Sequence, residues 1–181
     1  MARTLRWLAI PTIPQAPISL PNISGLARSP VTLPVTIGNV TGLGILAVQF
    51  TVVFDTSVVR VTNATNAGTL TAGWNIAVNS STPGRITVGL SSASPLAGSG
   101  TVVNLIGTLN NAGVSTLVFN SCVFNDGTPA AIVTDGSVKS VLHTLPFQFV
   151  KNFPDDNFRP MSGINNGIAV DPAGKVWVQT Y

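Results

Sequence analysis

Charged residues are scarce in this chain of 181 residues. They make up 8% of the sequence, against about 25% in an average soluble domain. The nine Lys and Arg residues are scattered singly, so the formal net charge of +3 does not arise from a basic patch. Because binding of nucleic acid by phosphate neutralisation requires clustered cations, we expect no nucleic-acid partner.

Groups that carry out catalysis are equally few. The chain has no Glu, a single His (His143), a single Cys (Cys122), and only Asp55 as an acid in its first 120 residues. General acid–base catalysis needs paired titratable groups, and metal-assisted hydrolysis needs a cluster of His, Cys or carboxylate ligands. We therefore expect that the chain is not an enzyme and holds no cofactor. A calcium ion at Asp126 or Asp155–Asn157 stays open as an alternative, although neither segment has EF-hand spacing.

Long apolar runs are also missing. No stretch of about 18 consecutive apolar residues occurs, so we expect no transmembrane helix. Arg3 and Arg6 precede a short apolar run that imitates a signal peptide, but Pro11 and Pro14 interrupt it, and we expect this segment to belong to the mature chain. Cys122 lies in an apolar run and is expected to be a buried small hydrophobe rather than a reactive thiol.

What the sequence does contain is alternation of apolar and polar residues, rich in Thr, Val and Ile and interrupted by Gly and Pro. This period of two, without helical spacing, predicts an all-β sandwich or barrel. Pro34 is expected at an edge or a bulge. We predict strands over 18–20, 31–37, 44–54, 58–62, 74–79, 85–90, 101–109, 115–124 and 137–141.

The composition divides the chain into three parts. Residues 1–17 form an apolar arm that its prolines keep extended. Residues 18–141 form the β-sandwich, and residues 142–181 form a linker followed by a β-hairpin extension. The turn of this hairpin is predicted at Asp171-Pro-Ala-Gly174.

The order of motifs in the central part resembles a cohesin domain. The strongest segments are Val31-Thr-Leu-Pro-Val-Thr-Ile37 and the strand from Gly44-Ile45 to Phe54-Asp55. Further matching segments follow in the family's order, at Gly73–Asn79, Gly84–Val88, Pro95–Val102, Phe124–Gly127 and Asp135–Val138. The resemblance implies a jelly-roll β-sandwich, related to carbohydrate-binding modules, that receives dockerin modules in extracellular assemblies.

The resemblance also implies where a partner binds. In cohesins one sheet face recognises the dockerin, and polar residues on the strand after the Gly-Ile motif are prominent among the contacts. The positions that match are Ala47, Gln49 and Thr51. Cellulosomal members have Asn and Asp where this chain has Ala47 and Gln49, so the resemblance implies an assembly role more firmly than a cellulosomal dockerin partner.

Both ends of the chain offer further candidate contacts. Residues 163–181 are similar to the inner strands of an NHL-type β-propeller blade, with Val176 and Trp177 as candidate contact residues. A propeller needs at least about four blades, so this segment is either a truncated propeller or pairs elsewhere. In the arm, Leu5, Trp7 and Ile10 could add a strand to a neighbouring subunit. The shortage of charge removes the usual defence against such edge pairing.

Three functional hypotheses follow. The first is a non-catalytic extracellular or cell-surface interaction module that binds a dockerin-like protein through its sandwich. The second is a structural subunit that assembles into a filament or sheath through its terminal strands. The third is a carbohydrate-binding module that stacks sugars on Trp74 or Trp177. In a host that glycosylates, we expect Asn63 and Asn79, in predicted loops or strand ends, to be the carriers.

Overall fold

The computed structural model describes residues 13–142 together with the strands at 168–170 and 176–178. The chain divides into two compact units, residues 1–144 and 145–181. The described part of the first unit is built from strands and turns and contains no helix. No described helix is long and apolar enough to cross a membrane.

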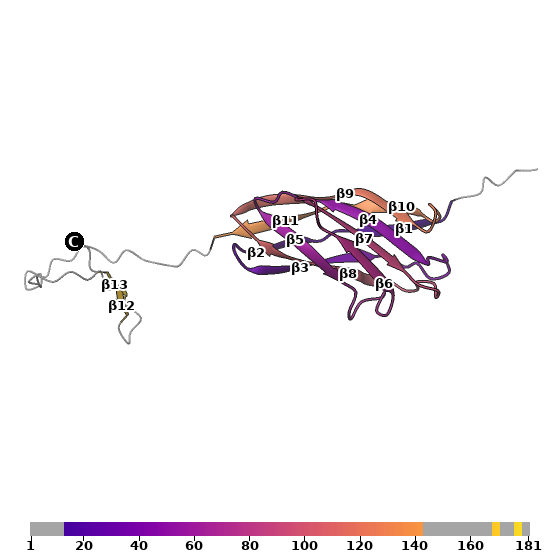
Figure 1. Cartoon of the computed structure of the whole chain (residues 1–181), viewed down its shortest axis with the longest axis horizontal. Coiled ribbons are helices and arrows are strands. Elements are labelled where there is room, and N and C mark those ends of the chain that lie inside the picture. Colours follow the sequence, from indigo (N-terminus) through magenta and orange to yellow (C-terminus); the bar gives the residue numbers. More distant parts are fainter. Residues whose placement is uncertain (1–12, 143–167, 171–175, 179–181) are drawn as a thin grey trace, which may run out of the picture. The chain divides into compact units, whose positions relative to one another are not determined.

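Eleven strands of the first unit form two sheets that face each other (Figure 1). The five-stranded sheet has the order β10-β1-β3-β8-β5, and the six-stranded sheet has the order β2-β11-β9-β4-β7-β6. The strands are β1 (Gln15–Ser19), β2 (Asn22–Leu26), β3 (Pro30–Ile37), β4 (Ala47–Val53), β5 (Val59–Thr65), β6 (Asn75–Asn79), β7 (Arg85–Ser91), β8 (Gly100–Leu109), β9 (Gly113–Phe124), β10 (Ala130–Thr134) and β11 (Gly136–Val141). This arrangement confirms the predicted all-β jelly-roll sandwich.

The core lies between the sheets and is made by the alternating apolar residues. In β4 the side chains of Val48, Phe50 and Val52 are fully buried. The ring of Phe50 meets that of Phe119 edge-to-face, with 5.8 Å between the ring centroids. Since successive side chains of a strand point to opposite faces, burial of these residues turns the others of β4 outward.

Two strands were not predicted, β2 and β10. Each lies at the edge of a sheet and pairs in parallel, β1 with β10 and β2 with β11. Asn22-Ile-Ser-Gly25 has the composition of a turn, and β10 buries none of its side chains fully. Neither segment has a fully buried apolar side chain, and the partner of each lies more than a hundred residues away in the chain.

Pro34 does not lie on an edge strand, because β3 lies between β1 and β8. The bulge prediction is closer, since the register shifts between Val35 and Thr36. Of the residues of β3, only Thr36 and Ile37 pair with β1. Pro34 therefore has a neighbouring strand on one side only, which is β8. A residue without an N–H donor fits such a position.

In the second unit, β12 (Ile168–Val170) and β13 (Val176–Val178) pair antiparallel. The predicted turn between these strands, at 171–174, lies outside the described residues.

Candidate functional site

The three residues predicted as partner contacts lie together on the outer face of the six-stranded sheet. Strand β4 runs between β9 and β7 (Figure 1). Ala47, Gln49 and Thr51 alternate with the buried residues of β4 and therefore share its outward side. We call the outward side of β6, β7, β4 and β9 the candidate face.

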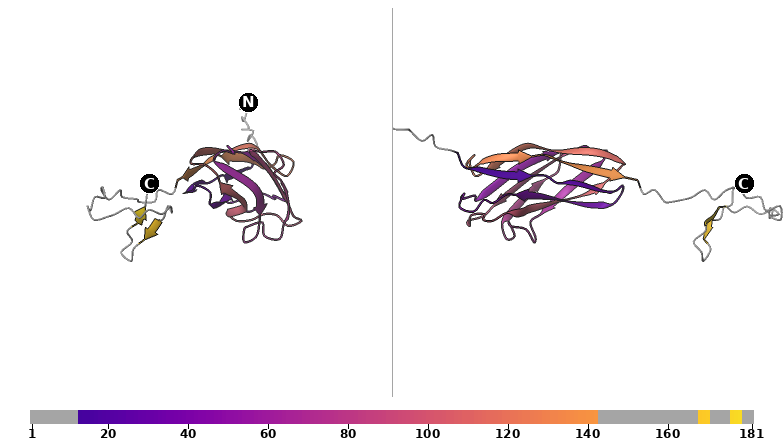
Figure 2. Two further views of the ribbon diagram at one scale, coloured as in Figure 1. Left: turned by 60° about the vertical axis from the view of Figure 1, so that its left-hand side comes forward. Right: turned by 180° about the vertical axis from the view of Figure 1, so that it is seen from behind.

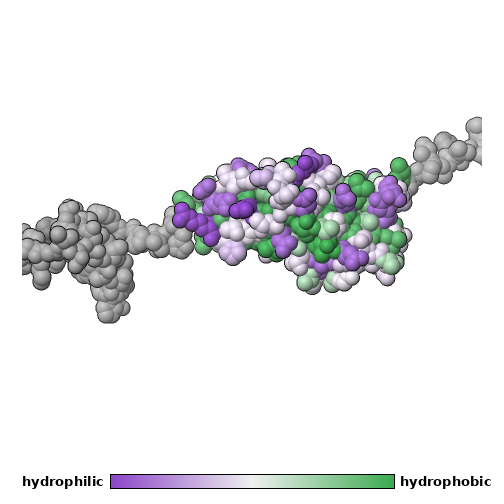
Figure 3. Space-filling model, viewed as in Figure 1, coloured by the Kyte–Doolittle hydropathy of each residue, from purple (hydrophilic) through white to green (hydrophobic). Residues whose placement is uncertain are grey.

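Cross-strand pairing places a row of small and apolar residues at the centre of the candidate face. Gln49 lies opposite Gly89 on one side and Val123 on the other, and Gly89 lies opposite Ala77. A Cβ atom built on Gly89 meets no other heavy atom within 4 Å, so the space over Gly89 is open. Val123 is 43% exposed. The side of the sandwich seen in Figure 3 likewise has hydrophobic patches between hydrophilic residues.

The next row carries hydroxyl and amide groups. It runs from Asn79 through Thr87 and Thr51 to Ser121. The hydroxyl oxygens of Thr51 and Thr87 lie 2.9 Å apart and form a hydrogen bond. Thr51 is only 5% exposed. Its hydroxyl is thus bonded within the sheet, and its role as a partner contact stays a prediction.

The side chain of Gln49 differs from that of Thr51 in exposure and in hydrogen bonding. Its side chain is exposed, and no hydrogen bond joins its amide to another described residue. The amide can therefore both donate to and accept from an incoming molecule. Ala47 is half-buried and contributes only a methyl group.

Asn125 fixes the end of the candidate face, a role the sequence analysis did not identify. Its Oδ1 accepts hydrogen bonds from the N–H groups of Leu46 (2.8 Å) and Ala47 (3.1 Å). Its Nδ2 donates to the carbonyls of Gly44 (3.1 Å) and Thr128 (3.0 Å). The Asn-Asp-Gly sequence gives a turn signal at this point, but it does not reveal that the amide joins the start of β4 to the end of β9.

The carboxylates of the sandwich hold backbone in place. Asp55 accepts a hydrogen bond from the Ser57 N–H at 2.8 Å, and the side chain and backbone of Ser57 lower the pKa of Asp55. Asp135 accepts from the Phe119 N–H at 2.8 Å.

No group of three or more candidate metal ligands gathers among the residues described. Asp155–Asn157, the other candidate for calcium, lies outside them.

Cys122 and Trp74 are both half-buried and pack against the core. Burial raises the pKa of the Cys122 thiol to about 11, so little thiolate forms at neutral pH. Trp74 keeps part of its surface exposed, so its role as a sugar-stacking platform stays a prediction.

The two candidate glycosylation sites lie on different sheets. Asn63 is exposed within β5, at a register shift opposite Ile106 of the five-stranded sheet. It is thus inside a strand, contrary to the expectation of a loop or strand end. Asn79 is exposed at the end of β6, on the candidate face.

The remaining predicted contacts belong to the two ends of the chain. Leu5, Trp7 and Ile10 lie outside the described residues, as does His143. Val176 and Trp177 belong to β13, where they pair with Val170 and Ala169.

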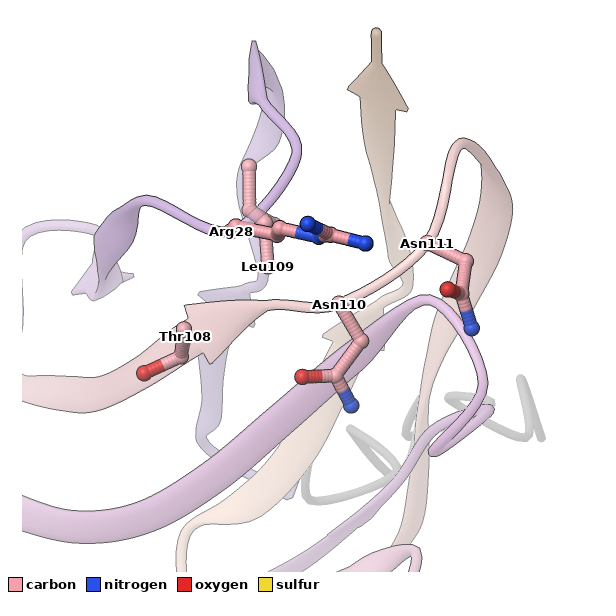
Figure 4. A pocket seen from close by; sticks show the side chains of 5 residues that line it. All are labelled: Arg28, Thr108, Leu109, Asn110 and Asn111. Atoms are coloured by element: carbon pink, nitrogen blue, oxygen red, sulfur yellow. The ribbon is translucent and has the colours of Figure 1, made fainter. Parts of the chain in front are cut away.

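A shallow pocket lies at one end of the sandwich, lined by Arg28 and residues 108–111 (Figure 4). Arg28 has a left-handed backbone, with φ of 65°. The side-chain amides of Asn110 and Asn111 donate to the carbonyls of Thr56 and Ser57 at 2.7 and 3.0 Å. These amide nitrogens hold the neighbouring turn in place.

Comparison with known proteins adds to this geometry. A family model described as "Cohesin domain" matches residues 18–141. A comparison with curated protein sequences gave no match.

Several solved structures share the fold. The sixth cohesin of scaffoldin B from Acetivibrio cellulolyticus, solved with a dockerin, is 21% identical with a TM-score of 0.62, and the match covers 70% of this chain and 99% of that one. A cohesin from Clostridium thermocellum, also solved with a dockerin, is 15% identical with a TM-score of 0.63, covering 74% and 100%. A non-cellulosomal cohesin from the archaeon Archaeoglobus fulgidus is 15% identical with a TM-score of 0.62, covering 70% and 91%.

Proposed function

The chain belongs to the cohesin family, and from this premise we propose that its candidate face docks a dockerin-type protein outside the cell or on its surface. Cohesins are non-catalytic protein-interaction modules that bind dockerins. The scarcity of His, Cys and acidic residues agrees with such a role.

The observation that carries the proposal is the position of Gln49. It stands at the centre of an exposed sheet face, flanked on both sides by neighbouring strands, with its amide free of other described residues. The position also matches one that contacts dockerins in the family. An exposed apolar side chain, Val123, lies directly beside it.

The partner is expected to differ from cellulosomal dockerins. Ala47 and Gln49 stand where those cohesins have Asn and Asp, so two short polar groups are replaced by a methyl group and a longer amide. We therefore propose a dockerin-type partner with a changed contact surface.

A binding assay with the full chain tests the proposal. A panel of immobilised dockerin modules is probed with the wild type, with Val123→Asp and with Asn104→Asp. Val123→Asp places a charge at the centre of the candidate face and should weaken binding by at least about tenfold. Asn104 lies on β8 in the opposite sheet, so Asn104→Asp should bind as the wild type does. Equal loss in both variants, or in neither, would contradict the proposed face.

The two other hypotheses have less support. Self-assembly depends on terminal residues that lie outside the described part of the sandwich. Polysaccharide binding has weaker support from Trp74, because that ring is partly buried against the core.

A further inference from the structure

The candidate face carries almost no charge. Strands β4, β6 and β9 contain no charged residue, and β7 contains only Arg85, its first residue. Arg85 lies four positions from Gly89 along β7, or about 13 Å at a rise of about 3.3 Å per residue. That exceeds the Debye length of about 8 Å at physiological salt. Arg85 therefore lies at the rim, electrostatically separate from the centre.

The second nearby charge lies at the opposite end of the face. Arg85 is paired with Val53, at the end of β4, whereas Asp126 follows the end of β9 beside the start of β4. A partner that covers the centre of the face thus meets neither a cation nor an anion there.

Two polar groups near the centre are hydrogen-bonded within the protein. The Thr51 hydroxyl is hydrogen-bonded to that of Thr87. The Asn125 amide makes four hydrogen bonds within its own loops. In the central row a partner finds the amide of Gln49 beside apolar surface from Ala77 and Val123.

From these observations we infer that the partner binds through an uncharged surface and places a branched apolar side chain in the open space over Gly89. This inference rests on the proposed function and specifies the chemistry of the partner at the same face. The open space has room for such a side chain, because nothing lies within 4 Å of a Cβ built at Gly89. Ala77 and Val123 provide apolar surface in the same row, and Gln49 provides the one hydrogen-bonding group.

Gly89→Val separates binding from folding. Gly89 lies inside β7 and its backbone is not left-handed, and Val is favoured in strands where Gly is not. The variant should therefore unfold at the same or a higher temperature than the wild type. By filling the open space over Gly89 it should weaken binding to a dockerin module by at least about tenfold. Asn104→Val, on the opposite sheet, is the matched control and should bind normally.

Salt provides the second measurement. The dissociation constant of the wild-type complex should change by less than about twofold between about 0.05 and 0.5 M NaCl, because no ion pair forms at the centre. Binding by Gly89→Val within about twofold of the wild type, or a salt-dependent weakening of about tenfold or more, overturns the inference while the proposed function stands.

The absence of binding to every dockerin module would instead count against the proposed function. In that case a display library of helical modules with randomised surfaces is selected on the wild-type chain and counter-selected on Gly89→Val. Enriched modules with uncharged, branched apolar residues would support the inferred chemistry of the face. Enrichment of Lys, Arg, Asp or Glu would overturn it.

Discussion

Removing the Asn125 side chain should destabilise the sandwich more than removing any comparable exposed amide. Asn125→Ala deletes four hydrogen bonds between the Gly44–Ala47 loop and the turn after β9. A hydrogen bond contributes about 0.5–1.5 kcal/mol net. Three of the four are exposed to water, which can replace part of the loss. The hydrogen bonds alone therefore account for about 2–3 kcal/mol.

The backbone adds a second contribution that a different variant isolates. Asn125 has a φ of 45°, in the left-handed region. This conformation costs an ordinary residue about 1–2 kcal/mol, and glycine adopts it without that cost. Asn125→Ala should therefore lower the free energy of unfolding by about 3–5 kcal/mol in total. Asn125→Gly, which loses the same hydrogen bonds, should be about 1 kcal/mol more stable than Asn125→Ala.

Equilibrium unfolding in urea, followed by the fluorescence of the half-buried Trp74, measures these differences. Asn104→Ala is the control, because no hydrogen bond joins the Asn104 side chain to another described residue. It should change the stability by less than about 0.5 kcal/mol. The reasoning is refuted if Asn125→Ala is as stable as this control, or if the glycine variant is less stable than the alanine variant.

Three further predictions concern single side chains. Ser140 is 2% exposed and its hydroxyl has no hydrogen-bond partner, so Ser140→Ala should raise the free energy of unfolding by about 1 kcal/mol in the same urea assay; a loss of that size would contradict it. The Ser57 hydrogen bonds lower the pKa of Asp55, so their stabilisation is present above the unfolded-state pKa of about 4 and is lost as the pH falls below it. Asp55→Asn should thus reduce the loss of stability between neutral and acidic pH, and an unchanged pH profile would argue against this. Finally, a maleimide-linked polymer on Asn79→Cys should abolish dockerin binding, whereas the same label on Asn63→Cys, on the opposite sheet, should not; Cys122, with its pKa raised to about 11, should stay unlabelled in the folded protein.

Local alternation was sufficient to predict the strands that carry the core. In β4 and β7 every second residue is apolar and buried, so the period of two appears directly in the sequence. The edge strands β2 and β10 lack that pattern, because their stability comes from pairing with segments remote in sequence. Their existence follows from the tertiary structure rather than from local preference.

The candidate face could be predicted only along β4. Alternation places Ala47, Gln49 and Thr51 on one side, whichever strands lie next to them. The neighbours of Gln49 depend on register, and the pairing of β4 with β9 shifts between Thr51 and Val52. Since a shift of one residue exchanges the inward and outward side chains, the positions of Val123 and Gly89 beside Gln49 required the structure.

The two parallel pairings determine how the sandwich responds to a stretching force. Segment Gln15–Leu26 runs beside Ala130–Val141, with the same register offset in both sheets. The described chain enters at the start of β1, at one end of the sandwich, and leaves after β11, at the other (Figure 2). Tension between these two points pulls the paired segments past each other along their length. The load is then shared by the hydrogen bonds of five residue pairs in each sheet, instead of opening them one after another. A domain threaded into a longer chain in this way would resist stretching while its candidate face stays intact at the side.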